Sequence, residues 1–247
     1  MLYKFIFLII LVTTINANSL KVAIASNVRF AFDDIMLAYE KKSGVKIMPI
    51  ASSSGKLTAQ IEQGAPFDLF LSANMKYPKY LHSKNMTYSE PKIYAYGGLV
   101  LWTLNKDVTL ELENLKNKRI KKIAIPSPKN APYGVEAVRL LEKKGLKEII
   151  EKKIVWGESI SQTSQYIYSR SADIGITAKS IVLSPRMKNK GKWIELDKND
   201  YFPVEQGIVI LKHGFENNRE LSEDFYKFIF SETSKNIFKK YGYTVNE

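Results

Sequence analysis

Four segments of this chain repeat one pattern, in which an apolar, strand-like run passes directly into a stretch with the apolar spacing of a helix. Small, hydroxyl or turn-forming residues stand at the four junctions: Ala25-Ser26-Asn27, Ser52-Ser53-Ser54-Gly55, Ala131-Pro132-Tyr133-Gly134 and Gly157-Glu158-Ser159-Ile160. Repeated strand–helix units are typical of mostly parallel sheets with helices on both faces. The sequence therefore predicts an α/β fold.

Two longer apolar segments interrupt this repeat and divide the chain. One runs from Tyr94 to Thr103 and contains Gly97-Gly98, and the other runs from Gly207 to Leu211. Because the strand–helix pattern restarts between them, we expect two lobes joined by two crossing strands. Lobe I would contain residues 18–97 and 205–247, and lobe II residues 98–204, with the ligand in the cleft between them. The last helix is expected to run from Glu220 to Tyr241.

The four junctions suggest what the cleft binds. A helix N-terminus carries N–H groups without intrahelical acceptors and the positive end of the helix dipole, so it favours anions. In open α/β sheets, ligands lie beyond the carboxyl ends of the strands. Four such junctions meeting at one cleft would surround a small anion with hydrogen-bond donors.

The first 17 residues have the layout of a secretory signal. A single lysine, Lys4, precedes an unbroken apolar run from Phe5 to Val12, and the small residue Ala17 suits a cleavage site. The apolar run is too short for a permanent membrane helix. Because the chain has no cysteine, a lipid anchor at the cleavage site is excluded, and we expect a free periplasmic protein.

The net charge is strongly positive, at +12 by formal count. The lysines are spread along the chain, and many of them stand at expected helix ends, where cations interact favourably with the dipole. Nucleic-acid binding would require a basic cluster interleaved with aromatic residues. The charge is therefore read as a solvated surface, and nucleic acid is not expected as a partner.

Several segments, in their order along the chain, resemble the periplasmic molybdate-binding proteins of ABC transporters (the ModA type). They are VAIASN (22–27), SSGKLTAQIEQGAPFDLFLSA (53–73), APYG (131–134), GESI (157–160) and FKKYGY (238–243). The resemblance covers essentially the whole mature chain. It implies the two-lobed fold of a type II periplasmic binding protein.

The resemblance also implies a ligand and its binding residues. Molybdate or tungstate would be held by hydrogen bonds from Ser26, Asn27, Ser54, the hydroxyl or amide of Tyr133, and the backbone N–H of Ile160. No cofactor and no directly ligated metal ion are expected. The partners would be the permease and ATPase subunits of an ABC transporter. The protein itself is expected to be a monomer that does not span the membrane.

One position departs from part of that family. Some members carry a tyrosine after the strand that here reads Gly175-Ile176-Thr177-Ala178, and this chain has Ala178 there. Other members have a tyrosine in the Ala-Pro-Tyr-Gly turn, as this chain does. The phenol role is therefore assigned to Tyr133.

Two other functions stay open from the residues. A hydrolytic enzyme would need a catalytic set, and the available candidates are Asp33-Asp34 with Asp68, or the histidines His82 and His213. The histidines lack metal-ligand spacing, and no nucleophile elbow or P-loop is present. The second alternative is a binding protein for another ligand, such as sulfate or a small carboxylate. A carboxylate site would favour an arginine fork, and only Arg29 lies near the junctions.

Overall fold

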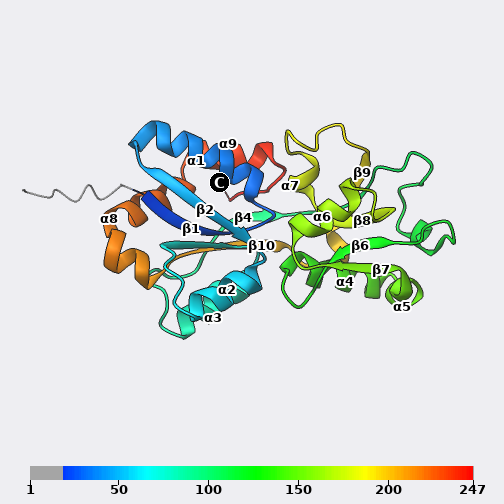
Figure 1. Cartoon of the computed structure of the whole chain (residues 1–247), viewed down its shortest axis with the longest axis horizontal. Coiled ribbons are helices and arrows are strands. Elements are labelled where there is room, and N and C mark those ends of the chain that lie inside the picture. The colour runs from blue at the N-terminus through cyan, green and yellow to red at the C-terminus, as the bar shows by residue number, and fades with distance from the viewer. Residues whose placement is uncertain (1–18, 247) are drawn as a thin grey trace, which may run out of the picture.

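The computed structural model describes residues 19–246, so the predicted signal peptide, 1–17, lies outside the described residues. Two five-stranded sheets form two lobes along the long axis of the molecule (Figure 1). In sheet order, the first contains β2 (Lys46–Ser52), β1 (Ser19–Ala25), β3 (Leu69–Ser72), β10 (Val204–Ile210) and β4 (Lys92–Gly97). The second contains β7 (Ile154–Gly157), β6 (Ile123–Pro126), β8 (Ile174–Ala178), β5 (Leu99–Thr103) and β9 (Lys192–Glu195). The predicted two-lobed α/β fold is confirmed.

Each sheet has a parallel centre. β1 pairs in parallel with β2 and β3, and β6 pairs in parallel with β7 and β8. The exceptions are β10, antiparallel to β3 and β4, and β5, antiparallel to β8 and β9. In a parallel set, all carboxyl ends lie at one edge of the sheet, so the loops that follow these strands are gathered together.

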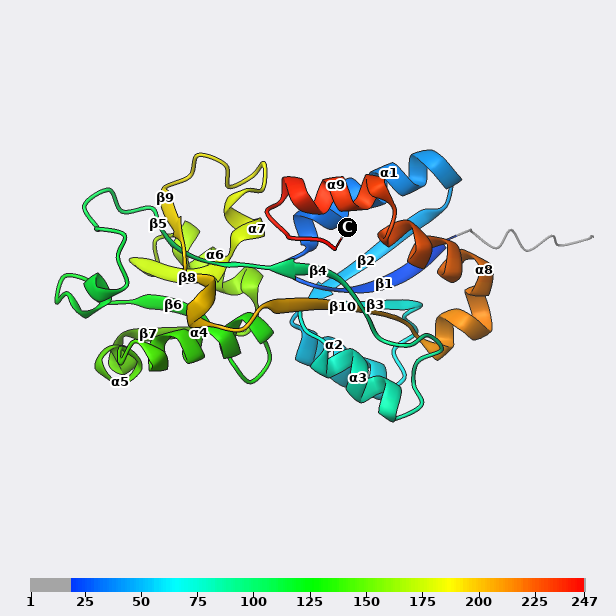
Figure 2. The same ribbon diagram turned by 180° about the vertical axis from the view of Figure 1, so that it is seen from behind.

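Two segments cross between the lobes (Figure 2). In the first, β4 ends at Gly97 and β5 begins at Leu99, so Gly98 alone separates strands of different sheets. In the second, the chain leaves lobe II and enters β10 at Val204. The division into 18–97 with 205–247, and 98–204, remains our proposal for the lobe boundaries.

Helices cover both faces of the two sheets. Those of lobe I are α1 (Arg29–Ser43), α2 (Ser54–Glu62), α3 (Lys76–Ser83), α8 (Lys212–Ile229) and α9 (Glu232–Lys240). Those of lobe II are α4 (Pro132–Lys143), α5 (Lys147–Ile150), α6 (Ile160–Tyr168) and α7 (Lys179–Val182), with short 3-10 turns at Glu113–Lys116, Glu151–Lys153 and Lys198–Asp200. Within residues 19–246, no helix has both the length and the apolar character needed to cross a bilayer.

The helix expected from Glu220 to Tyr241 is wrong as a single element. α8 ends at Ile229 and α9 begins at Glu232. Ser231 stands between them with extended backbone angles, and its Oγ accepts a hydrogen bond from the N–H of Ser234 at 3.3 Å. This N-cap begins a new helix, although the apolar spacing continues across the break.

Each lobe has its own hydrophobic core. In lobe I, Phe32 and Tyr39 of α1 pack edge-to-face against Phe225 of α8, with ring centroids 5.9 and 4.9 Å apart. In lobe II, Trp102 and Leu140 are fully buried in a cluster around β5 and β6. Burying one such side chain stabilises the fold by roughly 1.5–3 kcal/mol, so each sheet is a rigid base for the loops at its edge.

Candidate anion-binding site

The junction between β2 and α2 contributes two serines. Ser53 is the N-cap of α2, with extended backbone angles, and Ser54 is the first helical residue. The Ser54 Oγ accepts a hydrogen bond from the N–H of Ala73, just beyond β3, at 2.9 Å. That bond leaves the hydroxyl hydrogen of Ser54 available to a ligand. The Ser53 Oγ is buried and has no hydrogen-bond partner among residues 19–246.

The junction after β1 contributes Ser26 and Asn27, both almost fully buried. The Ser26 N–H donates to the carbonyl of Ser52 at 2.9 Å, which ties this turn to the neighbouring junction. The side-chain amide of Asn27 donates to Gln206 Oε1 at 2.8 Å and to the Tyr243 hydroxyl at 2.9 Å. The turn is therefore fixed by contacts beyond its own loop.

The junction between β6 and α4 presents Tyr133. Ala131 is the N-cap and Pro132 the first helical residue, a position that proline favours because its missing N–H would have no acceptor there. The Tyr133 hydroxyl lies 3.4 Å from Asn27 Nδ2 and against Gly97, where an added Cβ would overlap it. The Tyr133 hydroxyl thus packs among buried residues beside β4, whereas the Tyr133 backbone N–H lies at the N-terminus of α4.

The junction between β7 and α6 presents Ile160. Ser159 caps the helix, and its Oγ accepts from the N–H of Gln162 at 3.2 Å. Ile160 is the first helical residue, so its N–H has no acceptor within the helix. The N–H of Ser161 donates across the cleft to Ser26 Oγ at 3.3 Å.

The structure brings all five sequence-predicted residues together around one cavity between the lobes. Ser26, Asn27, Ser54, Tyr133 and Ile160 line it. Ser53, three alanines and a proline complete the lining, so no charged side chain of residues 19–246 takes part. The wall offers hydroxyls and helix N-terminal N–H groups, which suit a ligand whose surface consists of hydrogen-bond acceptors.

Burial governs the ionisation of the tyrosines at this site. It raises the pKa of Tyr133 well above the usual value for a phenol. It also raises the pKa of Tyr243 to about 12, although hydrogen bonds to Ser180 and Asn27 act in the opposite direction. Both hydroxyls therefore remain protonated at neutral pH and keep their hydrogens for donation.

Contacts across the cleft show that the lobes are closed. The N–H of Gly55 in α2 donates to the carbonyl of Asn130 at 3.1 Å. Lys56 forms a salt bridge with Glu158, at the exposed mouth of the cleft. Glu158 and the exposed Lys129 do not line the cavity, so neither charge faces the ligand space.

Sequence reasoning missed Gln206, Tyr243 and Ser180, which form hydrogen bonds with Asn27 and do not line the cavity. The Ser180 Oγ donates to the Asn27 carbonyl at 2.7 Å. Gln206 carries a weak signal that could have been noticed, because it is a polar residue at the start of the apolar run Gly207–Ile210 of β10, and the structure buries it fully. Tyr243 carries none, since 216 residues separate it from Asn27.

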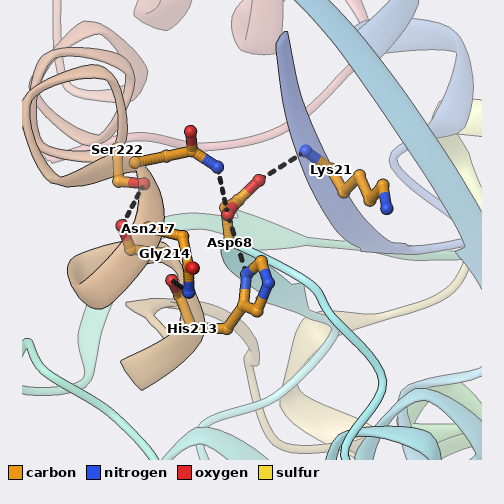
Figure 3. Close-up of polar contacts among 7 residues, drawn as sticks. Lys21, Asp68, His213, Gly214, Asn217 and Ser222 are labelled. Carbon is orange, nitrogen blue, oxygen red and sulfur yellow. Dashed lines mark hydrogen bonds and ion pairs between the residues drawn. The ribbon is translucent and has the colours of Figure 1, made fainter. Parts of the chain in front are cut away.

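The carboxylates considered for an enzyme have structural partners instead. Asp68 is buried, and its Oδ2 accepts from the N–H of Lys21 at 2.7 Å (Figure 3). Its Oδ1 accepts from His213 Nδ1 at 3.1 Å and from Asn218 Nδ2 at 3.0 Å. Lys21 lies near the start of β1, away from the edge where the cavity lies, so Asp68 anchors α8 to the sheet.

The remaining candidates lie apart from the cavity as well. Asp33 pairs with Arg29, and Asp34 accepts from Lys240 at 2.8 Å. His82 bonds to Thr87. Over residues 19–246, no group of three or more His, Cys, Asp or Glu side chains has a geometry suited to a metal ion.

Comparison with known proteins agrees with this geometry. The family model for bacterial extracellular solute-binding proteins matches residues 20–244. The chain belongs to this family. It is 32% identical to the molybdate-binding protein ModA of Azotobacter vinelandii over 229 residues, which cover 92% of this chain and 90% of that protein. It is 31% identical to ModA of Rhodobacter capsulatus, over 92% and 88% of the two chains.

Solved structures agree with the family assignment. The periplasmic molybdate-binding protein of Azotobacter vinelandii superposes with a TM-score of 0.86 at 28% identity, over 92% of this chain and all of that one. The sulfate-binding protein SubI of Mycobacterium tuberculosis superposes at 0.77, over 92% and 86% of the two chains, but at 13% identity it shows only a shared fold. As a member of a solute-binding family, this chain is a binding protein and not an enzyme.

Proposed function

We propose that this chain is the periplasmic component of an ABC transporter that captures molybdate, and tungstate with it, for delivery to a permease and its ATPase. The observation that carries the proposal is the cavity between the lobes, which is lined by Ser26, Asn27, Ser54, Tyr133 and Ile160 and, within the described part of the chain, by no charged side chain. The similarity of the chain to two molybdate-binding proteins, over 92% of its length, supports molybdate as the ligand.

The chemistry of the ligand suits such a wall. Molybdate is fully ionised at neutral pH, so its four oxygens only accept hydrogen bonds. A protonated phosphate would also need an acceptor. Each charge-assisted hydrogen bond contributes roughly 1.5–3 kcal/mol when well formed, so several of them offset the costs of association and closure. Sulfate has the same shape and charge but is a smaller ion than molybdate, and we expect the two anions to be discriminated by size.

Each proposed donor has a role that follows from its position. Ser26 and Ser54 would donate from their hydroxyls. Asn27, Tyr133 and Ile160 would donate from backbone N–H groups at or beside helix N-termini, where the dipole favours an anion. The Tyr133 hydroxyl would act indirectly, through its contact with Asn27.

Capture would proceed by closure of the lobes. Lobe I supplies the first two junctions and lobe II the other two, so the anion bridges the lobes and favours the closed form. The bonds from Gly55 to Asn130 and from Ser161 to Ser26 then join the two rims. The crossing segments at Gly98 and before Val204 would act as the hinge. The permease would recognise the closed, loaded molecule.

Calorimetric titration of the mature chain, from Asn18 onward, tests the proposal. Molybdate, tungstate, sulfate and phosphate are titrated in parallel. The expected result is tight binding at one site by the first two anions and silence from the others. Preference for sulfate would move the protein to another oxyanion transporter. Silence from all four would contradict the proposed function altogether.

A further inference from the structure

Asn27 is held at two separate points by one residue that the cavity wall does not include. The hydroxyl of Tyr243 accepts a hydrogen bond from Asn27 Nδ2 at 2.9 Å. The same hydroxyl lies 3.0 Å from the Asn27 carbonyl oxygen, to which it can donate. It therefore contacts both the side chain and the backbone of a residue proposed to face the anion.

The Tyr243 hydroxyl also reaches the other lobe. Ser180, the second residue of α7 in lobe II, donates from its Oγ to the same Asn27 carbonyl at 2.7 Å. The Tyr243 hydroxyl lies 3.2 Å from that Oγ, so its single hydrogen has two acceptors within reach. The two hydroxyls and the carbonyl form a buried triangle, which joins the Asn27 turn to the C-terminal segment and to lobe II.

The position of Tyr243 is itself well fixed. The N–H of Tyr96 in β4 donates to the carbonyl of Thr244 at 2.7 Å, and the Thr244 N–H donates back to Tyr96 at 2.9 Å. The Tyr243 ring packs edge-to-face on Phe238, with centroids 5.8 Å apart, and is 4% exposed. The hydroxyl is thus presented from a rigid base, which a support for a binding residue requires.

We propose that Tyr243 is a positioning residue of the anion site, which fixes Asn27 through its side chain and its carbonyl so that the turn of Ser26 and Asn27 meets the anion already oriented. This inference rests on the function proposed above. Fixing the turn before binding removes an ordering cost that would otherwise weaken affinity. The proton needed for the bond stays in place at neutral pH, because burial raises the pKa of Tyr243 to about 12.

Tyr243→Phe is the direct test, since it removes the hydroxyl and keeps the ring. The matched control is Tyr94→Phe. Tyr94 is also buried and packs on Phe238, with centroids 5.1 Å apart, but its hydroxyl has no hydrogen-bond partner among residues 19–246. We expect Tyr243→Phe to weaken molybdate binding roughly 3- to 30-fold. Tyr94→Phe should bind like the wild type.

Ser180→Ala is a second, independent probe of the same carbonyl. Its control is Ser184→Ala, because Ser184 is also buried but donates to the carbonyl of Ile181 within its own segment. Weaker binding in the first variant and unchanged binding in the second are expected. Circular dichroism of each variant confirms that it is folded.

A double variant separates positioning from general loss of structure. If Tyr243 acts through Asn27, Tyr243→Phe should weaken binding by a smaller factor in an Asn27→Ala background than in the wild type. A residue with only a structural role would have the same effect in both backgrounds.

Two results would overturn this inference and leave the proposed function standing. The first is that the wild type and Tyr243→Phe bind molybdate with the same affinity. The second is that Tyr94→Phe loses as much affinity for molybdate as Tyr243→Phe. Failure of the wild type to bind molybdate or tungstate would instead overturn the proposed function, and this inference with it.

Discussion

Ser54 combines two hydrogen-bonding roles in one hydroxyl, and this makes its substitution informative. Ser54→Ala removes a proposed donor to the anion and leaves the buried N–H of Ala73 without its acceptor. We expect molybdate affinity to fall roughly 10- to 100-fold and the free energy of unfolding to fall by about 1–3 kcal/mol. Calorimetric titration and urea unfolding measure the two effects.

The control for Ser54→Ala is Ser234→Ala in α9. Ser234 is as fully buried, and its Oγ donates to the carbonyl of Phe228 at 2.7 Å, away from the cavity. The Ser234→Ala variant should therefore be less stable than the wild type and should bind molybdate with the same affinity. Equal affinities in Ser54→Ala and the wild type would remove Ser54 from the proposed site.

At the residue scale, the sequence shows which residues stand at helix starts, because capping and turn chemistry are local. Ser54 stands in such a pattern, whereas Ile160 is expected at the site only from the resemblance, and both line the cavity. The residues behind them were not predictable in this way. Gln206 and Tyr243 meet Asn27 across separations of 179 and 216 residues, so their contact depends on the topology of the whole chain.

Among the elements, β4 and α4 are coupled by a close approach at Gly97. A Cβ at this position would overlap the Tyr133 hydroxyl and lie 3.1 Å from Gln206 Nε2. We therefore expect Gly97→Ala to displace Tyr133 and with it the N-terminus of α4, lowering both the melting temperature and the affinity for molybdate.

The neighbouring glycine supplies a control for Gly97→Ala. At Gly98 the nearest atom to an added Cβ is the Tyr201 hydroxyl, 3.7 Å away, which is an ordinary contact. Gly98→Ala should keep the melting temperature of the wild type, and only this property serves as the control because Gly98 lies in the proposed hinge. If the two variants melt alike, the packing of Tyr133 on β4 does not govern the stability of this region.

The pattern of elements was readable because strand–helix repeats have strong periodicity, and the crossing of Tyr94 to Thr103 was marked by its glycines. The boundary between α8 and α9 could not be predicted from the sequence, because the apolar spacing continues across it and only the cap at Ser231 separates the two helices. A single serine in a long amphipathic stretch is too common to identify such a break.

For the whole molecule, the proposed closure is measurable in solution. We expect the radius of gyration from small-angle X-ray scattering to fall when molybdate is added, because the bond between Gly55 and Asn130 and the salt bridge between Lys56 and Glu158 join the lobes only when they approach. Sulfate at the same concentration should leave the scattering unchanged. An identical curve with and without molybdate would argue against a hinge.

Alkaline pH should destabilise the whole molecule through its buried tyrosines. Burial raises the pKa of Tyr243 and of Tyr241 to about 12, whereas a phenol in the unfolded chain keeps its ordinary pKa of 10.0. Above pH 10 the folded state therefore binds more protons than the unfolded state, so stability falls as pH rises. The loss for Tyr243 alone is of the order of 2–3 kcal/mol by pH 12.

Urea unfolding at intervals from pH 8 to 12 measures this dependence. Tyr243→Phe should show a shallower decline than the wild type. If the free energy of unfolding stays constant over this range, the pKa values of Tyr243 and Tyr241 do not differ between the folded and unfolded states, which would contradict the prediction.

The strand order of the first sheet also determines when that sheet can form. β10 lies between β3 and β4, yet it follows them by more than a hundred residues, while every strand of the second sheet lies within one continuous stretch of chain. During synthesis, lobe II therefore has all its strands before β10 exists, and β3 keeps an open edge. Exposed strand edges invite aggregation, and late, non-local pairing is slow. Lobe I therefore depends on the last part of the chain to be made, and a chain truncated before β10 would carry a nascent sheet that cannot be completed.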